Sequence, residues 1–360
     1  MENPLGQGLR ELPGPLLLTG HTGFKGTWMT FLLEYLNLSV VGFSLPAEKD
    51  SLFDRSGRTG AIPELLADIR DYETLENFID EKKPSTIIHM AAQPLVLQSY
   101  ENPRETFDVN VMGTVNVLDI AFKKDFVEAI VVVTTDKVYR NHSTGRDFIE
   151  TDPLEGKDPY SASKVGTEAV VTAWQQIQQL TGGPKVVSAR AGNVIGGGDF
   201  AEHRIVPDLI RFLMGQSEIR IRNPYSSRPW QHVIEPLVGY IRYLEHVLGG
   251  SQVKNLNFGP HGPSLSVKEL IELGSRVFPN LNEISIANQN LNPFRESHSL
   301  SLGIDLSKNA IDWTPKWEQE EAILKTFEWW REYFKDQNSL KNLCRSDIKD
   351  YMMRLSESQI

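Results

Sequence analysis

Short apolar runs alternate with longer amphipathic segments through the first half of this chain. A run of about four to eight apolar residues is typical of a buried parallel strand, whereas apolar residues that recur every three or four positions are typical of a helix. The apolar runs predict strands at 16–19, 40–44, 86–89, 129–134 and 186–190. The amphipathic segments predict helices at 27–36, 75–81, 103–123 and 161–180. Repeated β-α-β units of this kind predict an α/β fold with a Rossmann-type, doubly wound parallel sheet.

The amino-acid composition changes after Gly192, where Gly, Pro, Arg and Trp become frequent. Loops of this composition carry binding function more often than structure. We therefore expect residues 1–190 to form the Rossmann domain and residues 191–335 to form mainly a smaller α/β substrate-binding domain, part of which returns to the first. A helix is expected at 322–334. Residues 336–360 are expected to be a tail with a weak helical pattern.

Composition narrows the choice of partners and of compartment. The chain has 360 residues and a net charge of −10, which argues against non-specific nucleic-acid binding. Cys344 is the single cysteine, so neither an internal disulfide nor a cysteine metal cluster is possible. No stretch approaches the roughly 20 apolar residues of a membrane span, and the start lacks the pattern of a signal peptide. We expect a cytoplasmic protein without a metal and without membrane or nucleic-acid partners.

A glycine-rich loop follows the first predicted strand directly. Its sequence, Gly20-His21-Thr22-Gly23-Phe24-Lys25-Gly26, has the spacing G-x-x-G-x-x-G. Such glycines let the backbone turn tightly and approach a diphosphate, whose charge then lies at the N-terminus of the next helix. Glycines after a strand can also merely form a turn, so the loop needs the other motifs of the chain to indicate a nucleotide cofactor.

Further polar or small residues follow other predicted strands. Asp68 and Ile69 come after a short strand, and Ala91, Ala92 and Gln93 come after the strand at 86–89. Small residues there would let a dinucleotide lie across the edge of the sheet, because the carboxyl ends of parallel strands share that edge. The Val-rich strand ends in Thr134, Thr135, Asp136 and Lys137.

Tyr160 and Lys164 form a Y-x-x-x-K pattern at the start of a predicted helix. Residues four apart lie on one helix face, and an ammonium beside a phenol lowers the phenol pKa from about 10. A phenol tuned in this way is a general base for a hydroxyl group, and a nearby nicotinamide would take the hydride from the same carbon. An isolated Y-x-x-x-K is common on helix surfaces, and Asp136-Lys137 alone could be a surface charge pair. The order of the motifs favours the chemical interpretation.

These motifs, taken together, resemble the extended short-chain dehydrogenase/reductases that act on nucleotide sugars. A finer resemblance, to the CDP-glucose 4,6-dehydratases, covers the chain to about Trp330. Besides the glycine loop, it is carried by Ala91-Ala92-Gln93-Pro94-Leu95-Val96, Asp136-Lys137, Tyr160-Ser161-Ala162-Ser163-Lys164, Ala189-Arg190-Ala191-Gly192-Asn193-Val194-Ile195-Gly196-Gly197-Gly198-Asp199 and Arg228-Pro229-Trp230-Gln231-His232-Val233.

The resemblance implies internal hydride transfer from C4 to C6 of the sugar through NAD, giving a 4-keto-6-deoxy sugar for deoxysugar pathways such as lipopolysaccharide O-antigen synthesis. Tyr160 would deprotonate the 4-hydroxyl with help from Thr135 and Lys164. Asp136 would be the acid that protonates the departing 6-hydroxyl, and Lys137 the base or proton shuttle at C5. Many 4,6-dehydratases have Glu where this chain has Lys137, and lysine suits the CDP-glucose branch.

The expected binding residues fall into two sets. The NAD set comprises Gly20, Thr22, Gly23, Phe24, Lys25, Gly26, Asp68, Ile69, Ala91, Ala92, Gln93, Asn110, Thr134, Tyr160 and Lys164. The set for the nucleotide sugar, CDP-glucose, comprises Gln93, Asn193, Arg204, Arg228 and Arg295. Arginine suits these positions because its guanidinium matches a phosphate bidentately.

Some questions remain open at the level of sequence. Ser44 ends the second predicted strand, where an acid would indicate NAD and arginines would indicate NADP, so NAD follows from the resemblance alone. His21 and Lys25 are bulky for a glycine loop, and His21 could crowd the diphosphate and loosen NAD binding. The alternatives are a dehydratase of GDP-mannose or dTDP-glucose, a nucleotide-sugar 4-epimerase, which needs no acid at Asp136, and a non-enzymatic redox-sensing protein.

The helices at 103–123 and 161–180 carry apolar residues on more than one face. These residues are Val109, Val111, Val115 and Leu118 on the first, and Val165, Ala169, Val170 and Trp174 on the second. Two such helices from each subunit can build an isologous four-helix interface. The sequence therefore predicts a homodimer.

Overall fold

The computed structural model describes residues 5–141, 145–221, 223–286 and 300–357. Within them, the main sheet has seven strands, all paired in parallel, in the order β11-β6-β5-β4-β1-β2-β3. The strands are β1 (Leu16–Thr19), β2 (Val40–Ser44), β3 (Glu64–Leu66), β4 (Thr86–His89), β5 (Ala129–Thr135), β6 (Lys185–Ala191) and β11 (Asn255–Phe258). The predicted doubly wound parallel sheet is confirmed. Strand β11 joins this sheet although its residues lie in the second predicted range.

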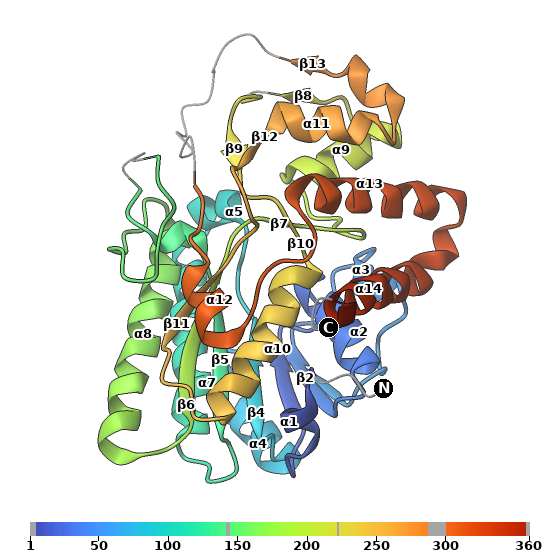
Figure 1. The fold of residues 1–360 in the computed structure, drawn as a ribbon. Helices are drawn as coiled ribbons and strands as arrows, with labels where there is room; N and C mark the ends of the chain where they lie inside the picture. The colour runs from blue at the N-terminus through green and yellow to red at the C-terminus, as the bar shows by residue number, and fades with distance from the viewer. Residues whose placement is uncertain (1–4, 142–144, 222, 287–299, 358–360) are drawn as a thin grey trace.

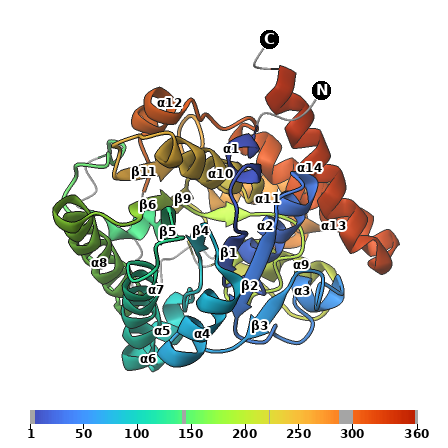
Figure 2. The ribbon, with the colours of Figure 1, turned by 90° about the horizontal axis from the view of Figure 1, so that it is seen from below.

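Helices cover both faces of the main sheet (Figures 1 and 2). On one face lie α2 (Phe24–Tyr35) and α10 (Ile234–Leu248), in a core that includes Leu16, Leu18 and Val131. On the other lie α4 (Tyr72–Lys82), α7 (Gly113–Ala121) and α8 (Pro159–Thr181), in a core that includes Leu17, Ile87 and Val132. Successive residues of a strand thus serve opposite cores, as the two-residue period of a strand requires.

The predicted helix at 103–123 is interrupted. The structure divides it into α6 (Pro103–Phe107), the π-helical turn η1 (Asp108–Met112) and α7. In this turn the Asn110 side chain accepts a hydrogen bond from the Gln93 amide (2.8 Å) and donates to the Gln93 carbonyl (3.1 Å) and to Ser163 Oγ (2.8 Å). Thr114 and Thr167 both donate to the Asn110 carbonyl. These contacts hold the turn between β4 and the start of α8.

A smaller lobe lies beyond the carboxyl ends of the main strands (Figure 1). Its strands pair as β7 (Val194–Ile195) with β10 (Gln231–His232), β9 (Ser227–Arg228) with β12 (Leu265–Ser266), and β8 (Arg220–Ile221) with β13 (Ser285–Ile286). Its helices are α9 (Ile205–Leu213), α11 (Val267–Ser275), α13 (Gln319–Lys335) and the 3-10 turn η3 (Pro279–Glu283). The other short helices are α1 (Gln7–Arg10), α3 (Leu52–Arg55), α5 (Val96–Glu101), α12 (Asp305–Ile311), and the 3-10 turns η2 (Asp136–Val138) and η4 (Gln337–Ser339).

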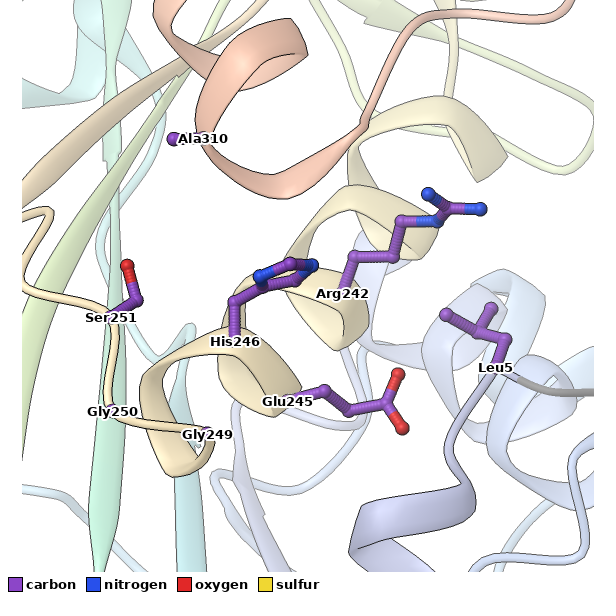
Figure 3. Close-up of a pocket in the computed structure, with 8 residues that line it drawn as sticks. All are labelled: Leu5, Arg242, Glu245, His246, Gly249, Gly250, Ser251 and Ala310. Atoms are coloured by element: carbon purple, nitrogen blue, oxygen red, sulfur yellow. The ribbon is translucent and has the colours of Figure 1, made fainter.

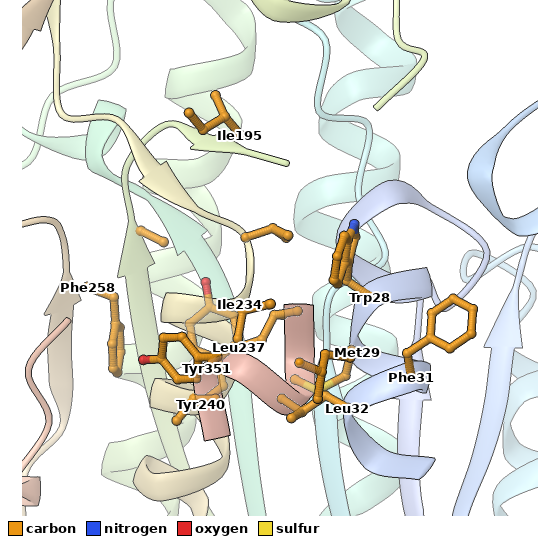
Figure 4. Packing of buried hydrophobic residues seen from close by; sticks show 14 of the residues in the cluster. Trp28, Met29, Phe31, Leu32, Ile195, Ile234, Leu237, Tyr240, Phe258 and Tyr351 are labelled. Carbon is orange, nitrogen blue, oxygen red and sulfur yellow. The ribbon is translucent and has the colours of Figure 1, made fainter. Parts of the chain in front are cut away.

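The C-terminal tail forms one well-packed helix, α14 (Leu340–Glu357). Cys344, Ile348, Met352 and Leu355 are buried, and the helix packs against α2. Figure 4 shows Tyr351 of α14 in the same core as Trp28 and Leu32 of α2 and Leu237 of α10. The helix therefore completes the larger core. No described helix is long and apolar enough to cross a membrane.

Candidate active site

The glycine loop joins β1 to α2 and leaves the start of that helix open. Gly20 adopts φ +75° directly after β1, and a Cβ at Gly26 would lie 2.1 Å from the Gly20 carbonyl oxygen. Gly23 is the N-cap residue of α2, and no side chain caps the helix there. A bare helix N-terminus offers backbone N–H groups and a positive dipole to an anion. Beside it, Thr22 Oγ1 donates to the Leu45 carbonyl and bonds Ser44 Oγ (2.7 Å).

The two bulky residues of the loop point in different directions. The His21 ring is fully buried against Gly42 of β2, and its Nε2 lies 2.6 Å from Glu64 Oε2 at β3. Lys25 Nζ donates to Tyr240 Oη on α10 (2.8 Å). Burial, together with the positive charges of Lys164 and Arg204, lowers the pKa of Lys25 to about 7. Lys25 therefore lies among the expected catalytic side chains.

The predicted NAD-binding residues that come after β3 and β4 lie beyond the carboxyl ends of these strands. Asp68 forms an ion pair with Arg70 (2.6 Å), and the Ile69 carbonyl accepts from Asn116 Nδ2 (3.1 Å). The Ala91 amide donates to Thr19 Oγ1 at the end of β1 (3.1 Å). The Gln93 side chain donates to Thr106 Oγ1 and to the Leu95 carbonyl, so its amide nitrogen is already engaged within the protein.

Thr135, Asp136, Lys137 and Tyr160 lie together where β5 ends and α8 begins. Thr135 Oγ1 donates to Asp136 Oδ1 (3.0 Å) and accepts from the Lys137 amide (3.3 Å). Lys137 Nζ lies 5.9 Å from the centre of the Tyr160 ring. Asp158 caps α8 in a capping box with Ser161, and Ser99 Oγ accepts from the Tyr160 amide (3.1 Å). The local structure thus fixes the start of α8 against the end of β5.

Burial acts strongly on the catalytic candidates. It raises the pKa of Tyr160 to about 12, opposed by a hydrogen bond with Thr135 and by the charge of Arg204. It lowers the pKa of Lys164 to about 8, while the nearby Glu168 raises it. Lys164 Nζ donates to the Val133 carbonyl (3.3 Å). The expectation that the phenol would be tuned toward neutrality is therefore wrong for this structure, because desolvation of the phenolate outweighs the hydrogen bond with Thr135 and the charge of Arg204.

Asp136 is almost fully buried, and burial raises the pKa of its carboxyl group despite opposing contributions from Lys137, Thr135 and Arg228. A Cβ at Gly192 would lie 3.1 Å from Asp136 Oδ2 and 3.2 Å from Pro229 Cγ. The motifs that contain Asn193 and Arg228 therefore meet at Asp136. Arg228 Nη1 donates to the Ser227 carbonyl (2.8 Å), and the Asn193 carbonyl accepts from the Gln231 amide (3.1 Å).

Arg204 also belongs to this group of residues. Its Nη1 lies 3.0 Å from Asp199 Oδ2, and its charge acts on both Tyr160 and Lys25. Arg295, the remaining predicted substrate residue, lies outside the described residues. Sequence reasoning did not single out Tyr240 or Glu168 as parts of this region. For Glu168 a signal existed, since it stands four residues after Lys164 and therefore on the same face of the helix.

Two further observations concern binding sites outside this group of residues. A pocket between α10 and α12, lined by Arg242, His246 and Ser251 among others, lies near Leu5 and away from the catalytic candidates (Figure 3). Among the described residues, no group of three or more His, Cys, Asp or Glu side chains could hold a metal ion.

Comparison with known proteins places the chain in a family. The family model for GDP-mannose 4,6 dehydratase matches residues 17–326. The chain is 37% identical over 346 residues to CDP-glucose 4,6-dehydratase from Salmonella typhimurium, covering 94% of this chain and 96% of that protein. It is 26% identical to UDP-glucose 4-epimerase from Halalkalibacterium halodurans, over 88% of this chain and 96% of the relative.

The fold is shared with solved structures. dTDP-glucose 4,6-dehydratase from Bacillus anthracis, solved in complex with NAD, superimposes with a TM-score of 0.75 at 22% identity and covers 92% of this chain and 99% of its own. This likeness concerns the fold, whereas the sequence relationship concerns the family. The chain therefore belongs to the GDP-mannose 4,6 dehydratase family, within the extended short-chain dehydrogenase/reductases.

Proposed function

We propose that this protein is a hydro-lyase that converts CDP-glucose to CDP-4-keto-6-deoxyglucose with NAD as cofactor. The observation that carries the proposal is the buried Asp136, whose raised pKa favours a protonated carboxyl beside Tyr160. A 4,6-dehydratase needs such an acid, whereas an epimerase does not. The 37% identity to the Salmonella typhimurium CDP-glucose 4,6-dehydratase supports the choice of reaction and of nucleotide.

The glycine loop fits the diphosphate of NAD. Gly23 leaves room at the start of α2, since the nearest atom to a Cβ placed there is the Gly20 carbonyl oxygen at 3.5 Å. We assign the diphosphate to the backbone of residues 20–26, with Asp68, Ile69, Ala91, Ala92, Asn110 and Thr134 placed along the sheet edge. The bound nicotinamide supplies the chemistry of accepting a hydride from C4 of the sugar and returning it to C6.

The protein residues move the protons. Tyr160 takes the proton of the 4-hydroxyl, helped by its hydrogen bond with Thr135 and by the charge of Arg204. Lys164, four residues later on the same helix face, is assigned as its partner. The resulting 4-ketone acidifies the hydrogen on C5, which Lys137 removes. Asp136 donates its proton to the 6-hydroxyl as it leaves as water. In the last stage C6 receives its hydride and Lys137 returns a proton to C5. Tyr160 releases its proton to solvent and Asp136 takes one up, so both groups are reset while the 4-ketone persists in the product.

The substrate residues come from the smaller lobe. Arg204 and Arg228 are assigned to the diphosphate, because both place positive charge near Asp136 or Tyr160. Asn193 offers an amide group to the sugar and its diphosphate. The side-chain amide of Gln93 is already hydrogen-bonded to Thr106 and Leu95, so it is not assigned to the substrate. We further propose a cytoplasmic homodimer, with α6, η1, α7 and α8 forming the interface, that acts in the synthesis of deoxysugars such as those of lipopolysaccharide O-antigen.

The test is incubation of the protein with NAD and, in separate reactions, CDP-glucose, dTDP-glucose and GDP-mannose, followed by mass spectrometry of the product. Loss of one water from CDP-glucose, without net NADH, is the expected result. Loss of water from another nucleotide sugar would change the substrate, and inversion at C4 with unchanged mass would replace the dehydratase by an epimerase. No reaction with any of them would contradict the proposal.

A further inference from the structure

A buried ion pair lies next to the segments that carry the catalytic candidates, the end of β5 and the start of α8. Glu168 on α8 and Arg190 on β6 have side chains that are 2% and 4% exposed. Arg190 Nε donates to Glu168 Oε1 (3.0 Å), and Arg190 Nη2 donates to Oε2 (2.7 Å). Thr134 Oγ1 donates to Oε1 (2.6 Å), and Ser188 Oγ donates to Oε2 (3.0 Å). Both carboxylate oxygens therefore have two donors, which a buried charge requires to be tolerated.

The pair joins each segment that carries a catalytic candidate. Thr134 lies opposite Arg190 in the β5–β6 register and precedes Thr135. Arg190 Nη1 donates to Tyr139 Oη (3.0 Å), just after Asp136 and Lys137, and to the Glu150 carbonyl (3.0 Å). Tyr139 Oη in turn donates to Asn257 Oδ1 on β11 (2.6 Å). Beyond Arg190, the chain leads in three residues to Asn193.

The negative charge of Glu168 also raises the pKa of Lys164, which lies one helical turn earlier on α8. Burial removes water from the Lys164 ammonium and lowers its pKa to about 8, and the negative charge of Glu168 is the influence that opposes this. The titratable groups on other elements that interact with the charge of Lys164 are Lys25 of α2 and His89 of β4, and the pKa of each is lowered. Without that charge, the neutral amine would become the stable form at a lower pH. The described hydrogen bonds of the Glu168 carboxylate go to Thr134, Ser188 and Arg190 and not to Tyr160, so its effect passes through Lys164 and Thr134.

We propose that Glu168, held by Arg190, is a positioning residue that sets a negative charge one helical turn from Lys164 and keeps the end of β5 aligned with the start of α8. This inference rests on the proposed dehydratase function for its kinetic readout. It differs from a purely structural role, in which the pair would contribute to stability and leave the ionisation of Lys164 unchanged.

The experiment measures kcat/KM for dehydration of CDP-glucose between about pH 6 and pH 10, in the wild type and in Glu168→Gln. The variant keeps an acceptor for Thr134 or Arg190 but loses the charge. At alkaline pH, kcat/KM is expected to fall as Lys164 loses its proton; this fall is called the alkaline limb of the profile. In Glu168→Gln the alkaline limb is expected at a pH about 1 unit lower than in the wild type. Well above that limb, the variant is then about tenfold slower than the wild type.

Ser188→Ala is the matched control, because it removes one hydrogen bond to Glu168 and leaves the carboxylate charge in place. Its alkaline limb is expected at the wild-type position. If Glu168→Gln does not fold because Arg190 is left unpaired, Glu168→Gln/Arg190→Gln removes both charges and is expected to show the same downward direction. A wild-type alkaline limb in the folded Glu168 variant would overturn the proposal.

A second readout does not depend on the substrate. The titration of Lys164 is followed by NMR of protein labelled at lysine Cε with ¹³C, with the signal assigned by its loss in Lys164→Arg. A lower titration midpoint in the Glu168 variant supports the proposal even if CDP-glucose proves not to be the substrate. An unchanged midpoint contradicts it even if the wild type is an active dehydratase.

Discussion

Asp136 and Tyr160 are both buried, and burial favours the neutral form of each group. For Asp136 this suits the proposed role, because a neutral carboxyl is an acid ready to donate a proton. For Tyr160 it opposes the proposed role, because a base must lose its proton. Tyr160 therefore depends on neighbours that favour the phenolate, among them Thr135 and Arg204. One physical effect thus creates the acid and also creates the need for a group of positive charges around the base.

Replacement of Asp136 by Asn is expected to separate the two halves of the reaction. The amide cannot protonate the leaving hydroxyl, so water elimination should fall by about 10²- to 10⁴-fold. Tyr160 and Thr135 remain, so oxidation at C4 should continue and NADH should accumulate. The measurement is absorbance at the NADH band together with product mass. Equal loss of NADH formation and of water elimination would show that Asp136 is not a dedicated acid.

At the residue scale, the sequence could predict the catalytic candidates but not the environment of each. The i, i+4 spacing placed Tyr160 and Lys164 on one helix face, and the end of the Val-rich strand supplied Thr135 and Asp136. It could not predict the direction of Lys25, because the side chain reaches Tyr240, 215 residues later in the chain. The strength of burial around Tyr160 was equally inaccessible, since it depends on residues distant in sequence, such as Thr135 and Arg204, that act on the phenol.

At the element scale, strands were easier to predict than the interruption of a helix. The buried parallel strands could be recognised in the sequence as apolar runs, and β1, β2 and β4 have the predicted bounds. The π-helical turn η1 could not be recognised in this way, because its amphipathic pattern continues that of α6 and α7 on either side. What fixes the turn is a set of hydrogen bonds from Asn110 to Gln93 and Ser163, which are distant in sequence.

The glycine loop offers a prediction that separates folding from cofactor binding. Gly26→Ala is expected to destabilise the free protein, because the new Cβ would meet the Gly20 carbonyl oxygen at 2.1 Å. Gly23→Ala is the matched variant, since its Cβ meets nothing closer than 3.5 Å in the protein. It should unfold at the wild-type urea concentration and bind NAD at least about tenfold more weakly, because the Cβ occupies the approach to the diphosphate. Wild-type affinity by calorimetry would contradict this assignment of the diphosphate.

At the scale of the whole molecule, α14 joins distant parts of the chain through buried acids. Glu235 on α10 accepts from Tyr351 Oη (2.5 Å) and from the Trp317 amide (2.7 Å). Asp347 Oδ2 lies 3.9 Å from His232 Nε2 of β10, and neither atom has a hydrogen-bond partner among the residues that the structure describes. Burial raises the pKa values of Glu235 and Asp347 to about 7. The helical pattern of this segment is weak in the sequence, because a docked helix depends on the surface that it covers.

The buried Asp347 should make stability depend on pH. Its pKa is higher in the folded protein than the usual 3.8, so its contribution is full at low pH and is lost as the pH rises through about 7. Asp347→Asn is therefore expected to be more stable than the wild type at pH 8, by up to about 4 kcal/mol, and similar to it near pH 4. Urea unfolding at both pH values checks this. An equal pH dependence in the two proteins would exclude Asp347 as the cause.

The proposed dimer can be tested on its exposed apolar face. Val109, Val111 and Val115 are only half-buried, and Met112 beside them is 50% exposed. Leu118, which the sequence placed on this face, is instead fully buried in the core of the subunit, because α7 turns that side toward the sheet. Met112→Glu is expected to give a monomer mass by light scattering, since it would bury a charge in the interface. Met353→Glu on α14, at 51% exposure, is the control and should leave the mass unchanged.

The packing of α14 against α2 has a consequence for how the protein is made. Helix α2 leaves the ribosome early, yet its partner α14 is synthesised about 300 residues later. At a typical elongation rate of about 5–20 residues per second, the apolar side of α2 waits roughly 15 seconds or longer for its cover. During that interval the nascent chain presents a surface of the kind that chaperones recognise. A chain that terminates early would present that surface permanently, so quality control could distinguish finished from unfinished copies of this protein.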